Sequence, residues 1–193
     1  KEFGNIYTRI MNPTTNTLEE RVAALEGGVA GLCVSSGQAA SAFVVQNLCS
    51  AGDNIVASTD LYGGTVNLFS NTLKSMGVEV RYADPSDPKN FEKLIDDKTR
   101  LFYAEVLPNP SLRVFPIKEV ADIGRPHGIP LIVDNTACPV ICKPIEHGAA
   151  IVMHSLTKFI GGHGNSIGGI IVDSGNFDWS VKKERQPNIW QPD

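Results

Sequence analysis

"AAIVMHSLTKFIGGHGNSIGGIIVD", residues 149–173, contains two short apolar runs that frame a single lysine and a glycine-rich turn. Runs of this length, bounded by turn residues, are typical of buried strands. Lys158 closely follows the first run and has the hydroxyl-bearing neighbours Ser155 and Thr157. A lysine in an apolar pocket has a lowered pKa and can act as a nucleophile or a base. The alternative is a strand-end lysine that extends its ammonium group into water.

Similar apolar runs recur along the rest of the chain, with helical stretches between them. We predict strands at residues 30–36, 54–58, 78–83, 100–106, 130–134, 149–155 and 168–173, and helices at residues 17–28, 37–50, 65–77, 90–97 and 117–128. Short strands that alternate with helices favour an α/β fold, with a mostly parallel sheet flanked by helices on both faces.

The helix predicted at residues 17–28 is amphipathic and has recognisable ends. Thr17 and Glu20 have the spacing of a capping box, and Gly27 with Gly28 is expected to end the helix. The stretch before it, residues 5–15, is polar and irregular. We expect it to lie on a surface or to reach toward a partner.

Composition excludes several classes of protein. The chain has 193 residues, enough for one domain with a sizeable core, and its net charge of -4 gives no general attraction to nucleic acid or to anionic membranes. No apolar run approaches the roughly 20 residues that span a bilayer, and the first residues are too polar for a signal peptide. The four cysteines fit buried free thiols in the cytoplasm, and the Cys138–Cys142 pair lacks the second ligand pair of a metal site. The abrupt ends indicate a truncated chain.

The polar residues of interest follow the predicted strands, where ligands bind in open α/β sheets. Gly37 lies at a strand-to-helix junction, which suits a phosphate, although a tight turn would explain it as well. Asp134 ends a buried strand, either as a helix cap or as an anion that faces a cationic ring nitrogen. Tyr62 can cover a ring face. A lysine, an acid, an N–H nest and an aromatic ring together fit pyridoxal phosphate.

A set of motifs occurs in one order along nearly the whole chain. They are "YTRIMNPTTNTLEERVAALEGG" (residues 7–28), "SSGQAA" (35–40), "DLYGGT" (60–65), "PNP" (108–110), "VDNT" (133–136) and "HSLTKFIGGHG" (154–164). With these motifs the chain closely resembles the Cys/Met-metabolism family of pyridoxal-phosphate enzymes. The resemblance implies fold type I, the aspartate-aminotransferase-like fold of pyridoxal-phosphate transferases. It also implies an N-terminal arm at residues 1–16 and an incomplete cofactor-binding large domain at residues 17–193.

The resemblance assigns roles to individual residues. Lys158 is expected to bind the cofactor covalently and act as a base, and Tyr62 to stack on the ring and assist proton movement. Asp134 is expected to pair with the ring nitrogen. The remaining cofactor contacts implied by the family are the N–H groups of Gly37 and Gln38, the hydroxyls of Ser155 and Thr157, Asn109 near the ring oxygen or the substrate carboxylate, and Tyr7 with Arg9, which would reach the phosphate of a neighbouring subunit.

The segment "KFIGGHGNSIGGIIVDSGNFDW", residues 158–179, is most similar to the O-acetylhomoserine sulfhydrylase branch of the family. This implies γ-replacement on O-acetylhomoserine by sulfide or a thiol, which yields homocysteine or methionine and acetate. A homo-oligomer is implied, with a dimer as the catalytic unit and a tetramer as the assembly. Leu156 and the loop "EVLPNPSL" depart from the commonest family pattern and would reshape the pocket.

Three alternatives remain open on the sequence. The first is another activity of the same family, such as methionine γ-lyase, cystathionine γ-synthase or a cystathionine lyase. The second is a catalytically incomplete fragment with a structural role. The third is a nicotinamide-dependent Rossmann enzyme, but the glycine-rich turn follows the lysine and precedes a strand, whereas the dinucleotide fingerprint opens a helix.

Overall fold

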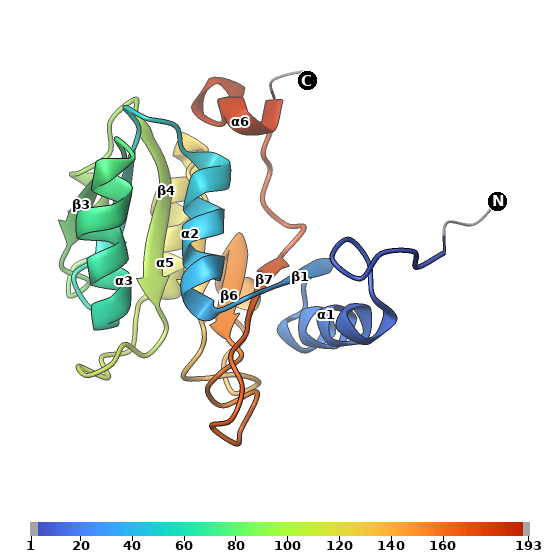
Figure 1. Ribbon diagram of the computed structural model, residues 1–193. Coiled ribbons are helices and arrows are strands. Elements are labelled where there is room, and N and C mark those ends of the chain that lie inside the picture. Colours follow the sequence, from blue (N-terminus) through green and yellow to red (C-terminus); the bar gives the residue numbers. More distant parts are fainter. Residues whose placement is uncertain (1–3, 191–193) are drawn as a thin grey trace.

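A computed structural model describes residues 4–190, which form one mixed sheet with helices on both faces (Figure 1). The sheet has seven strands in the order β1-β7-β6-β5-β4-β2-β3. The strands are β1 (Ala30–Val34), β2 (Asn54–Ser58), β3 (Glu79–Ala83), β4 (Thr99–Glu105), β5 (Leu131–Asp134), β6 (Ile151–Ser155) and β7 (Gly169–Asp173). The helices are α1 (Pro13–Glu26), α2 (Gly37–Leu48), α3 (Gly63–Asn67), α4 (Lys89–Glu92), α5 (Ile117–Gly124) and α6 (Pro187–Trp190). Short π- and 3-10 helices are η1 (Leu68–Leu73), η2 (Arg125–His127), η3 (Pro144–His147) and η4 (Lys183–Arg185).

The strand directions confirm the prediction of a mostly parallel sheet. Strands β2 to β6 run parallel to their neighbours among themselves, and β7 is antiparallel to both β6 and β1. All the carboxyl ends of the parallel strands therefore lie at one edge, which is the lower edge in Figure 1. The segment that carries α6 lies at the opposite edge (Figure 1).

The two faces of the sheet bury separate apolar layers. Along β4 the side chains alternate, so that Leu101 and Tyr103 pack with α2 and η1, while Phe102 and Ala104 pack with α4 and α5. Figure 1 shows α2 and α3 on one side of the sheet and α5 on the other. Every residue of β4 is buried, which explains why its centre, Leu101 to Ala104, is a continuous apolar run rather than an alternating one.

The first helix begins four residues earlier than predicted, and the capping box at Thr17 and Glu20 is wrong. The side chain of Asn12 caps the helix instead, accepting hydrogen bonds from the N–H groups of Thr14 at 2.9 Å and Thr15 at 3.2 Å. Pro13 occupies the first helical position, where its missing N–H group costs nothing. Thr17 lies inside the helix and donates to the carbonyl of Pro13. The predicted end is confirmed, because Gly27 adopts a left-handed conformation with φ of 79°.

Other elements differ from the predictions mainly in their bounds. The strand expected at residues 30–36 ends at Val34, and the helix expected at residues 90–97 shrinks to α4. The helix expected at residues 65–77 starts at Gly63 and continues as the π-helix η1. The connection between β5 and β6 holds only the 3-10 helix η3. The predicted domain boundary at residues 16 and 17 falls inside α1, and residues 1–3 and 191–193 lie outside the described part.

Within residues 4–190 no helix combines the length and the apolar character needed to cross a bilayer. Of the four cysteines, which are all free thiols, only Cys49 is buried and the other three are half-buried. The prediction of four buried thiols is therefore wrong for three of them.

Candidate active site

Most of the predicted site residues gather at the carboxyl edge of the parallel strands. Tyr62 follows β2, Asn109 follows β4, Asp134 ends β5, Ser155 ends β6, Thr157 and Lys158 lie in the turn after β6, and Gly37 and Gln38 begin α2. Parallel strands deliver their ends to one edge, so residues far apart in the sequence meet there.

A single hydroxyl group joins the ends of β5 and β6. Thr136 donates to Asp134 Oδ1 through its N–H group at 2.9 Å and through its side-chain hydroxyl. The hydroxyl oxygen of Thr136 also accepts a hydrogen bond from the N–H group of Ser155 at 2.8 Å. Sequence reasoning missed Thr136, although a hydroxyl residue two positions after a strand-end aspartate is a common turn signal.

The electrostatic setting of Asp134 suits a cationic partner. Burial raises the pKa of the Asp134 carboxyl group, against the lowering effects of the Thr136 hydrogen bonds and of His154. A positive group placed beside the carboxylate would lower this pKa and would in turn be stabilised in its protonated form.

The start of α2 approaches the end of β6 very closely. Gly37 is buried, and a Cβ atom added to it would lie 2.6 Å from Cβ of Ser155. Ser36 caps the N–H group of Ala39 at 3.0 Å, so the N–H groups of Gly37 and Gln38 face the open end of this 12-residue helix. Such an end binds anions through its N–H groups and its dipole.

We expect Gly37→Ala to destabilise the fold by about 1–3 kcal/mol, because the added methyl group forces α2 away from Ser155. The shift would also weaken phosphate binding at the helix end. Gly63→Ala is the matched control, since Gly63 also begins a helix but has nothing within 4 Å of the position that its methyl group would take. Thermal unfolding of both variants checks the prediction, and equal melting temperatures would contradict it.

The side chains of Gln38 and Thr157 both bond to neighbouring protein groups. Gln38 Nε2 donates to Thr65 Oγ1 at 3.3 Å, which ties α2 to α3. Thr157 Oγ1 accepts from the N–H group of Gly168 at 3.2 Å, which closes the turn that carries Lys158. These contacts hold the two segments in place. The predicted phosphate contact of Gln38 involves its backbone N–H group, which its side-chain bond to Thr65 does not occupy.

Tyr62 and Asn109 lie on exposed loops on either side of a buried acid, Glu105. The N–H group of Tyr62 donates to Glu105 Oε1 at 2.6 Å. Burial and the nearby Asp134 raise the pKa of Glu105 to about 8, although the backbone groups of Tyr62 and Asn109 act to lower it. Sequence reasoning missed Glu105, whose signal is an acidic residue inside the apolar run "RLFYAEV".

The raised pKa of Glu105 predicts a pH dependence of stability in the cofactor-free protein. The unfolded carboxyl group ionises near 4.5 and the folded one near 8, so the folded state holds the extra proton between these values. The free energy of unfolding should therefore fall as the pH rises from about 4.5 to about 8, by on the order of 5 kcal/mol from this group. Asp134 and Tyr103 are the ionisable groups that face Glu105.

Urea unfolding at several pH values checks this prediction, with Glu105→Gln as the comparison because glutamine does not titrate. The wild-type protein should lose more stability than the variant across this window. Parallel pH profiles for the two proteins would contradict the raised pKa of Glu105.

Lys158 lies in an exposed turn, so the predicted apolar pocket around it is wrong for the described residues. Its N–H group donates to the carbonyl of Ser155 at 3.3 Å, and its own carbonyl accepts from Gly162 at 2.8 Å. These bonds make a compact turn directly after β6, which presents the amine at the same edge of the sheet as Asp134.

Tyr7 and Arg9 are not brought to the strand ends. Both side chains are exposed, and the Arg9 guanidinium carbon lies 5.4 Å from the centre of the Tyr7 ring. Their expected role at a neighbouring subunit stays a prediction.

A buried cluster of three hydrogen-bonded polar side chains lies next to the site, and sequence reasoning missed it as well. Glu26 Oε1 bonds to His154 Nε2 at 2.6 Å and to Asn135 Nδ2 at 2.9 Å, with His154 only 1% exposed. Asn135 follows Asp134 and His154 precedes Ser155, so this group ties the end of α1 to both strand ends. A carboxylate in the last turn of a helix opposes the helix dipole, and this was the available signal.

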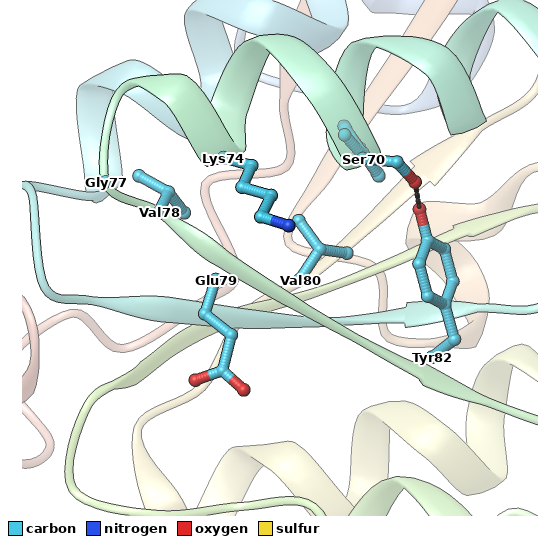
Figure 2. A pocket seen from close by; sticks show the side chains of 8 residues that line it. Ser70, Lys74, Gly77, Val78, Glu79, Val80 and Tyr82 are labelled. Carbon is cyan, nitrogen blue, oxygen red and sulfur yellow. Dashed lines mark hydrogen bonds between the residues drawn. The ribbon is translucent and has the colours of Figure 1, made fainter.

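An open groove of about 480 Å³ lies elsewhere, between η1 and the edge strand β3. Figure 2 shows Lys74 and Glu79 at this groove, with Ser70 bonded to Tyr82 at 2.9 Å. None of the predicted site residues lines it. The chemistry at the strand ends, rather than the size of a groove, therefore identifies the candidate active site.

The strand-end residues fit pyridoxal phosphate on two observations. The half-buried Asp134 carboxylate, with its raised pKa, suits a cationic ring nitrogen. The open end of α2 suits a phosphate, and only a glycine fits at its first position. The exposed amine of Lys158 lies in the turn after the neighbouring strand.

Comparison with known proteins agrees with this arrangement. Residues 1–190 match the family described as Cys/Met metabolism PLP-dependent enzyme. The chain is 54% identical over its whole length to O-acetyl-L-homoserine sulfhydrylase from Leptospira meyeri, covering 43% of that protein. It is 50% identical to homocysteine/cysteine synthase from Saccharomyces cerevisiae, over 98% of this chain and 43% of the relative.

A solved structure extends the likeness to the fold. It is described as an O-acetylhomoserine (thiol)-lyase from Campylobacter jejuni with a pyridoxyl-lysine monophosphate, and it matches with a TM-score of 0.92 and 38% identity. The match covers 96% of this chain and 46% of that one. The chain thus spans a little less than half the length of the relatives it matches.

Proposed function

The chain belongs to the Cys/Met metabolism family of PLP-dependent enzymes, and from this premise we propose that the protein that contains it carries out γ-replacement on O-acetylhomoserine. Sulfide or a thiol replaces the acetoxy group, which gives homocysteine or methionine and acetate. The 54% identity to an O-acetyl-L-homoserine sulfhydrylase is the observation that carries this proposal. The strand-end arrangement of Asp134, Lys158 and the start of α2 supports it.

In this proposal three parts of the site bind the cofactor. Asp134 holds the ring nitrogen, and the N–H groups of Gly37 and Gln38 hold the phosphate together with the hydroxyls of Ser155 and Thr157. Bound in this way, pyridoxal phosphate supplies an electron sink for the carbon that carries the substrate amine.

Lys158 and Tyr62 are the proposed catalytic residues. Lys158 binds the cofactor aldehyde through its amine and, once released, takes and returns protons at the substrate carbons. Tyr62, whose side chain is 47% exposed beside the site, stacks on the ring and assists proton movement as acetate leaves. Asn109 is placed near the ring oxygen or the substrate carboxylate.

The proposed architecture includes a neighbouring subunit. Residues 1–16 form an arm that brings Tyr7 and Arg9 to the phosphate site of a partner, and residues 17–193 form the cofactor-binding domain. The exposed position of both side chains supports such a contact. The proposed assembly is a homo-oligomer in which a dimer is the catalytic unit and a tetramer is the complete assembly. The predicted location is the cytoplasm.

The visible absorbance of the intact protein, recorded before and after addition of O-acetylhomoserine, tests cofactor and substrate together. Product assays then separate the related activities. O-acetylhomoserine with sulfide should give homocysteine and acetate, whereas methionine alone should give no volatile thiol. Turnover of methionine without O-acetylhomoserine turnover would assign a γ-lyase instead.

A further inference from the structure

We propose that Glu105 is a positioning residue, whose buried carboxyl group holds the end of the loop after β2 against β4 and thereby places Tyr62 at the active site. This inference rests on the proposed function for its kinetic part. Its structural part concerns only the contacts of the described residues.

Glu105 lies between the loop after β2 and the loop after β4. It is the last residue of β4, the strand between β2 and β5, and it pairs in register with Asp134. It is 7% exposed, although the loops around it are open to solvent. A buried acid needs a hydrogen-bond donor, and here the backbone supplies it.

The donor belongs to the loop after β2. Tyr62, at the end of this loop, donates its N–H group to Glu105 Oε1 at 2.6 Å. Because Glu105 is buried at the end of β4, this contact fixes the backbone of Tyr62 against the sheet and thereby the point from which its side chain projects.

Further contacts between these loops lie nearer the surface. Arg113 pairs with Asp60 at 3.2 Å, and the hydroxyl of Ser111 donates to the same Asp60 carboxylate at 3.2 Å. Arg113 is about half exposed, and exposed ion pairs contribute about 0 to 1 kcal/mol. Glu105 is the buried contact and the one directly attached to Tyr62, so it determines the placement of this residue.

The chemistry of the side chain explains why an acceptor is needed. A protonated carboxyl group keeps one acceptor oxygen, and a glutamine amide offers an acceptor oxygen in the same place. Glu105→Leu removes the acceptor at a similar size and leaves the Tyr62 N–H group without its partner. Glu105→Gln keeps an acceptor, so it should retain most of the function that leucine loses.

The first test needs neither cofactor nor turnover. Hydrogen exchange in the cofactor-free intact protein should be about tenfold or more faster at the N–H group of Tyr62 in Glu105→Leu than in the wild type, and close to the wild type in Glu105→Gln. The control is Asp173→Leu, because Asp173 also accepts a backbone N–H group, from Gly175 at 2.8 Å, at the opposite edge of the sheet. This control should leave exchange at Tyr62 unchanged. Unchanged exchange in Glu105→Leu would overturn the proposal even if the protein turns over O-acetylhomoserine.

The second test is a double-mutant cycle in the holoenzyme. Glu105→Leu should lower kcat/KM for O-acetylhomoserine about 10- to 100-fold with cofactor content retained, because a small displacement of a positioned group is costly. In a Tyr62→Phe background the same change should cost much less, since it acts through Tyr62. Glu105→Gln should recover most of the loss. Fully additive losses, or unchanged kcat/KM in Glu105→Leu, would sink the positioning role. Absence of turnover by the wild type would count against the proposed function alone, because the exchange result stands apart from it.

Discussion

Lys158→Ala is expected to lower turnover of O-acetylhomoserine by at least about three orders of magnitude. In the proposed function this amine both binds the cofactor and moves protons, so the substitution would remove two roles with one side chain. Stability should change little, because Lys158 is exposed and its hydrogen bonds are made by its backbone. The near-visible absorbance of the bound cofactor should shift toward that of the free aldehyde.

Lys143→Ala is the matched control for this prediction. Lys143 also lies at the surface, and its exposed ion pair with Glu146 spans 3.5 Å. It should keep both the absorbance and the turnover of the wild type. A Lys158→Ala protein with wild-type absorbance and turnover would remove Lys158 from the mechanism.

Asp134→Asn is expected to have the next largest effect, a loss of about 100- to 1000-fold in kcat/KM. Asparagine keeps the Oδ1 acceptor for both Thr136 donors, so the ends of β5 and β6 should stay joined. What disappears is the negative charge that keeps the ring nitrogen protonated. The electron sink is weakened while the fold and the phosphate contacts remain.

Asp173→Asn provides a control of the same local geometry. Asp173 ends β7, and its Oδ1 accepts the N–H group of the residue two positions later, Gly175, at 2.8 Å. This variant should retain kcat/KM, and steady-state kinetics with measured cofactor content would compare the two. If both variants lose activity equally, the effect of Asp134→Asn arises from the turn and not from its charge.

The sequence predicted the fold class and the positions of the strands because buried parallel strands are apolar runs whose length and spacing are visible directly. Asp134, Ser155 and Lys158 could be placed at one edge, since each follows such a run. The first residues of helices were harder to predict. Asn12 and Thr17 are both residue types that cap helices, and the structure shows that Asn12 is the cap and Pro13 the first helical residue.

Residues that act through distant partners could not be found in this way. Glu105 bonds to a residue 43 positions away, and Glu26 bonds to one 128 positions away. Both are acids in unfavourable local settings, and their hydrogen-bond partners depend on which strands become neighbours. The exposure of Lys158 agrees with the alternative of a strand-end lysine that extends into water, because the apolar residues before it belong to β6 and the lysine itself to the turn that follows.

Thr136 has a consequence for which small molecules the site can distinguish. Its one hydroxyl bonds to Asp134 and to the N–H group of Ser155, so the separation of the ends of β5 and β6 is fixed without a flexible side chain from outside these strand ends. Ser155 in turn packs closely against Gly37, so the distance from the acid to the start of α2 is fixed as well. With the proposed cofactor contacts, we expect this spacing to favour pyridoxal phosphate over pyridoxal that lacks its phosphate.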